Sequence, residues 1–187
     1  MARKKEYIEE EVAEKAMELF WRNGYKNTSM QMLEKEMGIN KFSIYSSFGS
    51  KNGLFLVSLR CYKKRLSKLM TELENSSEGL AGIKQYFYDF LEFSKDVELR
   101  KGCLITNTAN ELEEEPDLEI QNALIRFTDG VKGLFADVLR QDSSVSEESI
   151  EGLSDFLLIS LFGLSSASRV FTPAQLENYI ENIFKSI

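Results

Sequence analysis

Apolar residues recur every three or four positions along almost the whole of this 187-residue chain. That spacing is typical of α-helices that bury one face, because an α-helix has about 3.6 residues per turn. Only two prolines and eleven glycines interrupt the pattern. The sequence therefore predicts an all-α protein of about nine helices.

The first fifty residues predict three helices separated by tight turns. The first helix has an apolar stripe that ends at Asn23-Gly24 and is formed by Ile8, Val12, Ala16, Leu19 and Phe20. Thr28 is the expected N-cap of a short second helix that Gly38 ends, and Asn40 is the expected N-cap of the third. We expect residues 1–50 to form one domain and residues 51–187 another, with a long helix over 51–74 as the connector.

The remaining residues predict a longer helical bundle. A turn at "ENSSEG" precedes the next apolar stripe, and a short helix is expected over 103–112, closed by an acidic loop and Pro116. Another stripe follows over 124–138, and a largely apolar helix is expected over 147–169. Thr172, Pro173 and Gln175 then supply an N-cap, a first-turn proline and a capping-box glutamine for the last helix.

Charge is distributed unevenly between the two predicted domains. The chain carries a net charge of −7, but residues 1–65 contain 13 Lys and Arg against 8 Asp and Glu. The later residues hold the other 10 cationic side chains and 22 carboxylates. A basic head on an acidic body is the arrangement expected of a protein that attracts a polyanion at one end only.

The composition argues against several classes of protein. Histidine, the commonest general base and metal ligand, does not occur, and Cys61 and Cys103 are too few for a zinc site or a disulfide framework. We therefore expect no metal, no cofactor and no catalytic residue. No secretory signal and no apolar run of about 20 residues is apparent, so we expect a cytoplasmic protein without a membrane segment.

The third helix, in "GINKFSIYSSFGSK", has two contrasting faces. Ile44 and Phe48 point toward the predicted core, whereas Phe42, Ser43 and Ser46 lie on the opposite side. A short helix, a glycine turn and a second short helix form the helix-turn-helix arrangement, whose second helix enters the DNA major groove. The alternative is that Phe42 and Tyr45 fill a small helical core and the serines are merely solvated.

Residues 20–55, "FWRNGYKNTSMQMLEKEMGINKFSIYSSFGSKNGLF", resemble the DNA-binding domain of tetracycline-repressor (TetR) family regulators. The matching features include Gly24-Tyr25, Thr28-Ser29, Gly38, Ser43-x-Tyr45-x-x-Phe48 and Ser50-Lys51. The resemblance implies a homodimer that binds a palindromic double-stranded DNA operator. It also implies an all-helical C-terminal domain that dimerises and binds a small molecule.

The same resemblance implies roles for individual residues. Phosphate contacts are expected from Thr28, with Ser29 beside it, and from Ser43, Tyr45 and Lys51. Base-edge contacts are expected from Lys41, Phe42 and Ser46. Two residues depart from the family pattern, which commonly has a small residue in place of Phe42 and alanine in place of Glu34. Phe42 either contacts a thymine methyl group or packs against the protein.

A ligand pocket is expected among aromatic and amide side chains of the C-terminal domain. The candidates are Tyr86, Phe90, Phe93, Cys103, Asn107, Asn110 and Phe127. The competing interpretation is that these residues are ordinary core, and that Cys103 is a buried structural thiol and not a redox sensor or nucleophile. The acidic body favours a neutral or cationic small lipophilic ligand over an anionic one.

The last two helices carry more apolar surface than one intramolecular face requires. Pairing with the same helices of a second copy would cover it, whereas a monomer with a thick core is the alternative. Together these features predict a sequence-specific repressor that a ligand releases from its operator. Two other classes stay open: an enzyme using Cys103 or the acidic run 111–115, and a dimeric helical interaction protein without operator binding.

Overall fold

The computed structural model describes residues 7–95, 101–112 and 117–187 of the chain. These residues form nine α-helices, which confirms the all-α prediction: α1 (Glu9–Asn23), α2 (Met30–Met37), α3 (Lys41–Phe48), α4 (Lys51–Glu74), α5 (Leu80–Ser94), α6 (Leu104–Ala109), α7 (Leu118–Arg140), α8 (Glu147–Ala167) and α9 (Pro173–Lys185).

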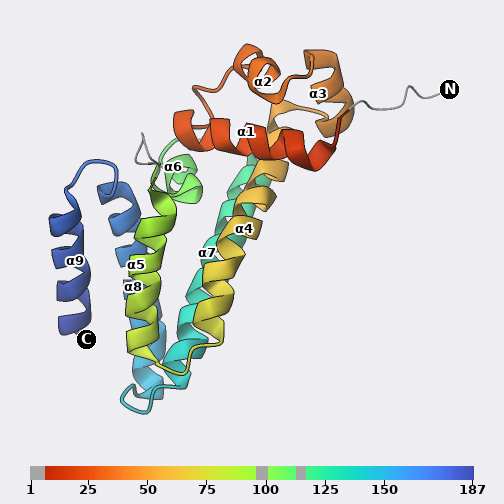
Figure 1. Ribbon diagram of the computed structural model, residues 1–187. Helices are drawn as coiled ribbons and strands as arrows, with labels where there is room; N and C mark the ends of the chain where they lie inside the picture. The colour runs from red at the N-terminus through yellow and green to blue at the C-terminus, as the bar shows by residue number, and fades with distance from the viewer. Residues whose placement is uncertain (1–6, 96–100, 113–116) are drawn as a thin grey trace.

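The helices divide into a head and a body. Helices α1, α2 and α3 form the head at one end of the molecule, and α4 leaves the head to run along the body (Figure 1). Helices α5, α7 and α8 complete a bundle with α4, and α9 lies on the outside against α5 and α8. The short α6 lies where the head meets the body, and it contacts α1, α4, α7 and α8.

One continuous core joins head and body through α4. In the head, Ile44 and Leu33 are completely buried, as is Phe20, whose ring meets that of Phe55 edge-on at 5.0 Å. Farther along α4, Tyr62 and Leu66 enter the core of the body. Because α4 packs in both regions, the boundary at residue 50 between a DNA-binding domain and a ligand-binding domain stays a prediction.

Local capping explains where most helices start. The side chain of Asn40 accepts a hydrogen bond of 2.9 Å from the Ser43 N–H, as predicted for the third helix. Thr172 and Gln175 form the expected capping box of α9. The prediction that Thr28 caps α2 is wrong, because the cap is Ser29, whose hydroxyl accepts from the Met32 N–H.

Two helices are shorter than their apolar patterns suggest. Helix α6 ends at Ala109, because the chain turns through Asn110 and the Glu111 carboxylate accepts a 2.9 Å hydrogen bond from the Lys26 N–H. Helix α8 ends at Ala167, where the Ser168 hydroxyl donates to the Ser165 carbonyl. Pro116 and residues 113–115 of the acidic run lie outside the described residues.

Helix α8 is long and apolar enough to cross a membrane by length and composition, which departs from the expectation that no such segment exists. In its most apolar stretch 39% of the residues are buried inside the molecule. The helix packs along α7 and α9 as part of the bundle, so a place within a helical bundle accounts for its buried side.

Candidate nucleic-acid interface and ligand cavity

The turn between α2 and α3 is closed by two hydrogen bonds to Glu34. Gly38 adopts the left-handed conformation, with φ of 70°, and its N–H donates a 3.0 Å hydrogen bond to the Glu34 carbonyl. This conformation suits glycine, since it has no Cβ. The Glu34 carboxylate accepts a hydrogen bond from the Lys41 N–H at the start of α3. Glu34 therefore adds a second, anionic cap to α3, a role that the sequence pattern did not indicate.

The outward face of α3 is available to a partner. Phe42 is 82% exposed and Tyr45 is 40% exposed, while Ile44 is buried beneath them. Ser46 is exposed and Ser43 is half-buried. The alternative in which Phe42 and Tyr45 fill a small core is therefore wrong for this fold, and Phe42 projects away from the protein.

Tyr7, just before α1, holds the side of α3 that carries Ser43 and Ser47, a role the sequence did not reveal. Its hydroxyl donates to the Ser43 carbonyl at 3.2 Å and lies 2.7 Å from the Ser47 hydroxyl. The residue is 36 positions from Ser43 in the sequence, so only the fold brings the two together. This contact limits rotation of α3 about its axis and so fixes the direction of its exposed side chains.

Lys51 is held against the head at the start of α4. Its ammonium lies 4.5 Å from the centroid of the Tyr25 ring, a cation–π distance. Burial lowers the pKa of Lys51 from its ordinary value, and the nearby Glu111 carboxylate opposes that shift. The Tyr25 hydroxyl bonds the Asn52 side chain in turn. Lys51 thus adds a positioned charge to the positive end of the α4 dipole.

Thr28 is buried in the head, whereas the family resemblance implies that it contacts a DNA phosphate. It has no exposed surface, and its hydroxyl donates a 2.6 Å hydrogen bond to the Gly24 carbonyl. A side chain in that position ties the loop between α1 and α2 and does not reach a ligand in this conformation. Its neighbour Ser29 is exposed and lies at the N-terminus of α2.

The positive charge of the head is concentrated by ion pairing. Lys64 pairs with Glu10, and Arg65 pairs with Glu18, so these α4 cations are neutralised by α1. Among the described residues, Lys35 and Lys41 have no carboxylate within ion-pair distance. Unpaired positive charge on the described part of the head therefore includes Lys35 on α2 and Lys41 on α3, together with Lys15 on α1.

The body encloses a small cavity between α4, α5, α6, α7 and α8. It holds about 10 Å³ of free space, close to the room that one water molecule requires. Four of the predicted pocket residues line it: Tyr86, Phe90, Cys103 and Phe127. Most of its other walls are aliphatic, from Leu66 on α4 to Leu161 on α8.

The other three predicted pocket residues have different surroundings. Phe93 packs between Trp21 and Tyr62, at ring-centroid distances of 5.4 and 5.8 Å. The Asn107 side chain donates to the Lys101 carbonyl at 2.8 Å and accepts from Arg169 at 3.3 Å. Asn110 is exposed at the end of α6. Phe93 and Asn107 thus pack at the junction, and none of the three lines this cavity.

Two polar groups line the cavity, the Cys103 thiol and the Tyr86 hydroxyl, and they differ in hydrogen bonding. The Tyr62 hydroxyl donates to Cys103 Sγ at 3.2 Å, and burial raises the pKa of the Cys103 thiol. A buried, protonated thiol is a poor nucleophile, which favours the structural role for Cys103. The Tyr86 hydroxyl is also buried, yet it has no hydrogen-bond partner in the described part of the chain.

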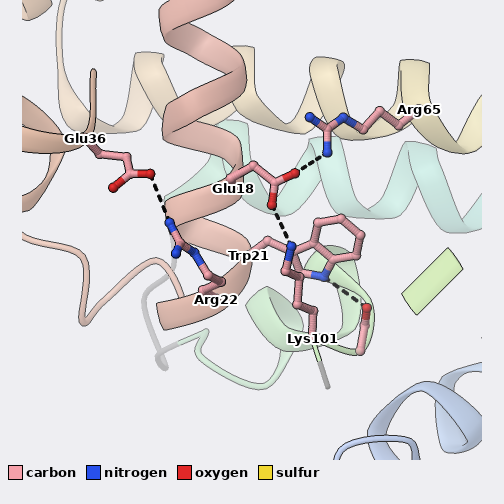
Figure 2. Close-up of polar contacts among 7 residues, drawn as sticks. Glu18, Trp21, Arg22, Glu36, Arg65 and Lys101 are labelled. Carbon is pink, nitrogen blue, oxygen red and sulfur yellow. Dashed lines mark hydrogen bonds and ion pairs between the residues drawn. The ribbon is translucent and has the colours of Figure 1, made fainter. Parts of the chain in front are cut away.

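A network at the junction ties the head to the segment that precedes the cavity (Figure 2). Glu18 on α1 lies between Arg65 of α4 and the Lys101 ammonium, the latter at 2.7 Å. One turn along α1, the Trp21 indole N–H donates to the Gly102 carbonyl at 2.9 Å. Because Gly102 adjoins Cys103, this hydrogen bond joins α1 to the wall of the cavity.

Comparisons with known proteins identify what the head and the whole fold are similar to. Residues 13–57 match the family model of "Bacterial regulatory proteins, tetR family". An HTH-type transcriptional regulator, YezE of Bacillus subtilis (strain 168), is 32% identical over 120 residues, which are 63% of this chain and 62% of YezE. The negative regulator IcaR of the Staphylococcus aureus biofilm operon is 24% identical over 105 residues, 56% of each chain. The matches thus span less than two thirds of these relatives.

Solved structures resemble the chain along nearly its full length. A cysteine mutant of the regulator CifR, in complex with double-strand operator DNA, has a TM-score of 0.87 at 26% identity, covering 98% of this chain and 99% of CifR. Reduced NemR of E. coli has a TM-score of 0.74 at 23% identity, covering 94% of each chain. The NemR likeness, at this identity, bears on the fold alone.

Proposed function

Because this chain belongs to the tetR family of bacterial regulatory proteins, we propose that it is a sequence-specific transcriptional repressor, released from a palindromic operator by a small-molecule ligand. The family consists of regulators, so no enzymatic activity is assigned to Cys103 or to the acidic run. The operator complex of CifR and the negative regulation described for IcaR support DNA binding and repression for this chain. We place the protein in the cytoplasm, where DNA is accessible.

The observation that carries this proposal is the exposed face of α3. Phe42 projects from the first turn beside Lys41, whose backbone N–H is already satisfied by Glu34. An apolar ring in that position suits contact with a thymine methyl group, and a lysine beside it suits a guanine edge. Ser46 extends the same face by a hydroxyl that can donate or accept.

The flanking residues are suited to hold the DNA backbone. Ser29 at the start of α2, Ser43 and Tyr45 on α3, and Lys51 at the start of α4 supply hydroxyl, phenol and ammonium groups. Phosphate binding is favoured at helix N-termini, where free N–H groups and the helix dipole attract anions. Thr28 is left out of this set because its hydroxyl is buried.

A second copy is proposed to cover the apolar surface of α8 and of the turn after it. Ile159 is 70% exposed and Val170 is 77% exposed, and Phe156 and Tyr179 add partly exposed rings on α8 and α9. Pairing these helices with their symmetry mates would bury that surface in a four-helix interface. Two heads would then face two half-sites about one DNA turn apart, roughly 34–36 Å.

The regulatory ligand is proposed to bind in the body and to act through the junction. Enlarging the cavity beside Cys103 would displace Gly102 and, through Trp21, tilt α1 and the head. A ligand shifts such an equilibrium only by binding one arrangement more tightly than the other. A change in head spacing would therefore lower affinity for two half-sites at fixed separation.

Selection from a random double-stranded DNA pool tests this function. The purified protein is expected to enrich one palindromic sequence, and a mobility-shift assay is expected to show binding that weakens steeply as salt rises. Its own upstream DNA is the natural second probe. Failure to enrich any sequence, with a folded dimer in hand, would favour the interaction protein without operator binding.

A further inference from the structure

An open groove runs along the outside of the body beside the enclosed cavity. It has a volume of about 580 Å³ and is formed by α4, α6 and α7. Buried apolar side chains, Leu59 and Ile105, form its floor together with the half-buried Phe127. A space of this size accommodates a small organic molecule, since ligand sites commonly measure about 300–1,000 Å³.

Three exposed cations line the same groove: Arg60 and Lys63 from α4, and Arg126 from α7. Within the part of the chain that the structure describes, none of them has a carboxylate within ion-pair distance. Their neighbours Lys64 and Arg65 do pair, with Glu10 and Glu18. Glu119 is the one carboxylate among the described lining residues, so the groove carries a local surplus of positive charge.

This surplus contrasts with the acidic composition of the body. Residues 51–187 hold 22 carboxylates against 15 cationic side chains. Three like charges gathered without partners repel one another, and an anion placed among them relieves that repulsion. Arginine also offers paired N–H donors that match the two oxygens of a carboxylate.

Phe127 connects the groove to the enclosed cavity, because its side chain lines both. On the far side of that ring lies the cavity that contains the unpartnered Tyr86 hydroxyl. A buried hydroxyl without a partner forgoes about 1–3 kcal/mol of hydrogen bonding. Tyr86 therefore marks a second polar position in the cavity that Phe127 separates from the groove.

We propose that the groove binds a small amphipathic anion, a carboxylate with an apolar body. The carboxylate lies among Arg60, Lys63 and Arg126, and the apolar part packs on Leu59 and Phe127. This inference goes beyond the proposed function, in which the ligand acts at the cavity beside Cys103, and it rests on that function for its regulatory meaning. Phe127 lines both spaces and so joins the groove to that cavity. The proposed anion replaces the neutral or cationic ligand that the overall acidity of the body favours.

Three eight-carbon probes with different head groups test the assignment: octanoate, 1-octanol and octyltrimethylammonium. Isothermal titration calorimetry at neutral pH is expected to show octanoate binding at least ~10-fold more tightly than 1-octanol, because charge-assisted hydrogen bonds add to the same apolar contact. The ammonium probe is expected to bind most weakly. Equal affinities for octanoate and 1-octanol would overturn the proposal.

Variants locate the site. Arg126→Gln and Arg60→Gln are each expected to weaken octanoate binding by about 10-fold while leaving 1-octanol unchanged. Arg140→Gln is the matched control, because Arg140 lies on the same helix, pairs with Asp137 and Glu147, and is not a groove residue. Unaltered octanoate affinity in both groove variants would place the binding elsewhere and overturn the assignment.

DNA measurements on the same samples separate this inference from the proposed function. Octanoate is expected to lower affinity for the selected operator in the wild type but not in Arg126→Gln. Selective octanoate binding that leaves operator affinity unchanged would contradict its role as the regulatory class. A protein that selects no DNA yet discriminates octanoate from 1-octanol would overturn the proposed function and leave the groove assignment intact.

Discussion

The indole N–H of Trp21 donates a 2.9 Å hydrogen bond to the Gly102 carbonyl, which joins the first helix of the head to the segment entering the cavity. The same indole meets the Tyr62 ring edge-on at 5.0 Å, and the Tyr62 hydroxyl donates to Cys103. One side chain of the head thus contacts two neighbours of the enclosed cavity. Communication between the two regions has a short physical route.

Replacing Trp21 with phenylalanine tests how much this contact stabilises the fold. Trp21→Phe leaves the buried Gly102 carbonyl without its donor, so the free energy of unfolding should fall by about 1–3 kcal/mol. Urea unfolding followed by circular dichroism measures it, since Trp21 is the chain's one tryptophan. Phe42→Ala, at an exposed position, should change stability by less than about 0.5 kcal/mol. Equal effects would argue against the contact.

The ion pairs of Glu18 predict a pH dependence. Burial alone would raise the Glu18 pKa, but hydrogen bonds from Lys101 and Arg65 outweigh it and hold the pKa below its ordinary value of 4.5. The stabilisation is therefore complete above pH 4.5 and is lost as pH falls through the folded-state pKa. Wild-type protein should lose more stability on acidification than Glu18→Gln, measured by urea unfolding at stepped pH. Parallel pH profiles would contradict this.

Tyr86→Phe should raise the stability of the unliganded protein. The variant removes a buried hydroxyl that has no partner in the described residues while preserving the ring against Phe135. A gain of about 1 kcal/mol is expected in the free energy of unfolding. Tyr88→Phe is the comparison, because its hydroxyl donates to Glu181 at 2.7 Å and its loss should give no gain. Destabilisation by Tyr86→Phe would indicate that the hydroxyl has a partner such as ordered water.

Ile159→Glu should separate the proposed dimer. The substitution places a charge in the centre of the apolar surface of α8, where desolvating it on association is costly. Light scattering after size-exclusion chromatography should give the mass of one chain. Leu118→Glu, at an equally exposed apolar residue on α7, should leave the dimer intact. Loss of the dimer in both variants, or in neither, would argue against this interface.

The sequence predicted the helices well because their boundaries depend on local chemistry. Asn40 and the Thr172–Gln175 capping box act within three residues, so the pattern places them correctly. Thr28 and Ser29 are adjacent hydroxyls, and only the path of the preceding loop decides which one is buried. The sequence also predicted correctly that Ile44 faces the core, because helical periodicity alone places it on the opposite side of α3 from Phe42.

Contacts between segments distant in the sequence could not be predicted from the spacing of apolar and polar residues. Tyr7 reaches Ser43 across 36 positions, and Arg60 meets Arg126 in one groove only because α4 packs along α7. Glu34 departs from the family pattern, yet its carboxylate closes the turn, a role that depends on the angle between α2 and α3. Net composition favours a neutral or cationic ligand and the groove favours an anion, because composition averages over surfaces that do not line the groove.

The exposed face of α3 is the surface proposed to read DNA. The most direct measurement is the ratio of affinities for the selected operator and for a shuffled duplex, obtained by fluorescence anisotropy near physiological salt. Wild-type protein should prefer the operator by at least ~10³-fold. A Lys41→Ala/Phe42→Ala variant should lose most of that preference while keeping its helical content. A wild-type ratio near one, or a variant that retains the full preference, would contradict the account.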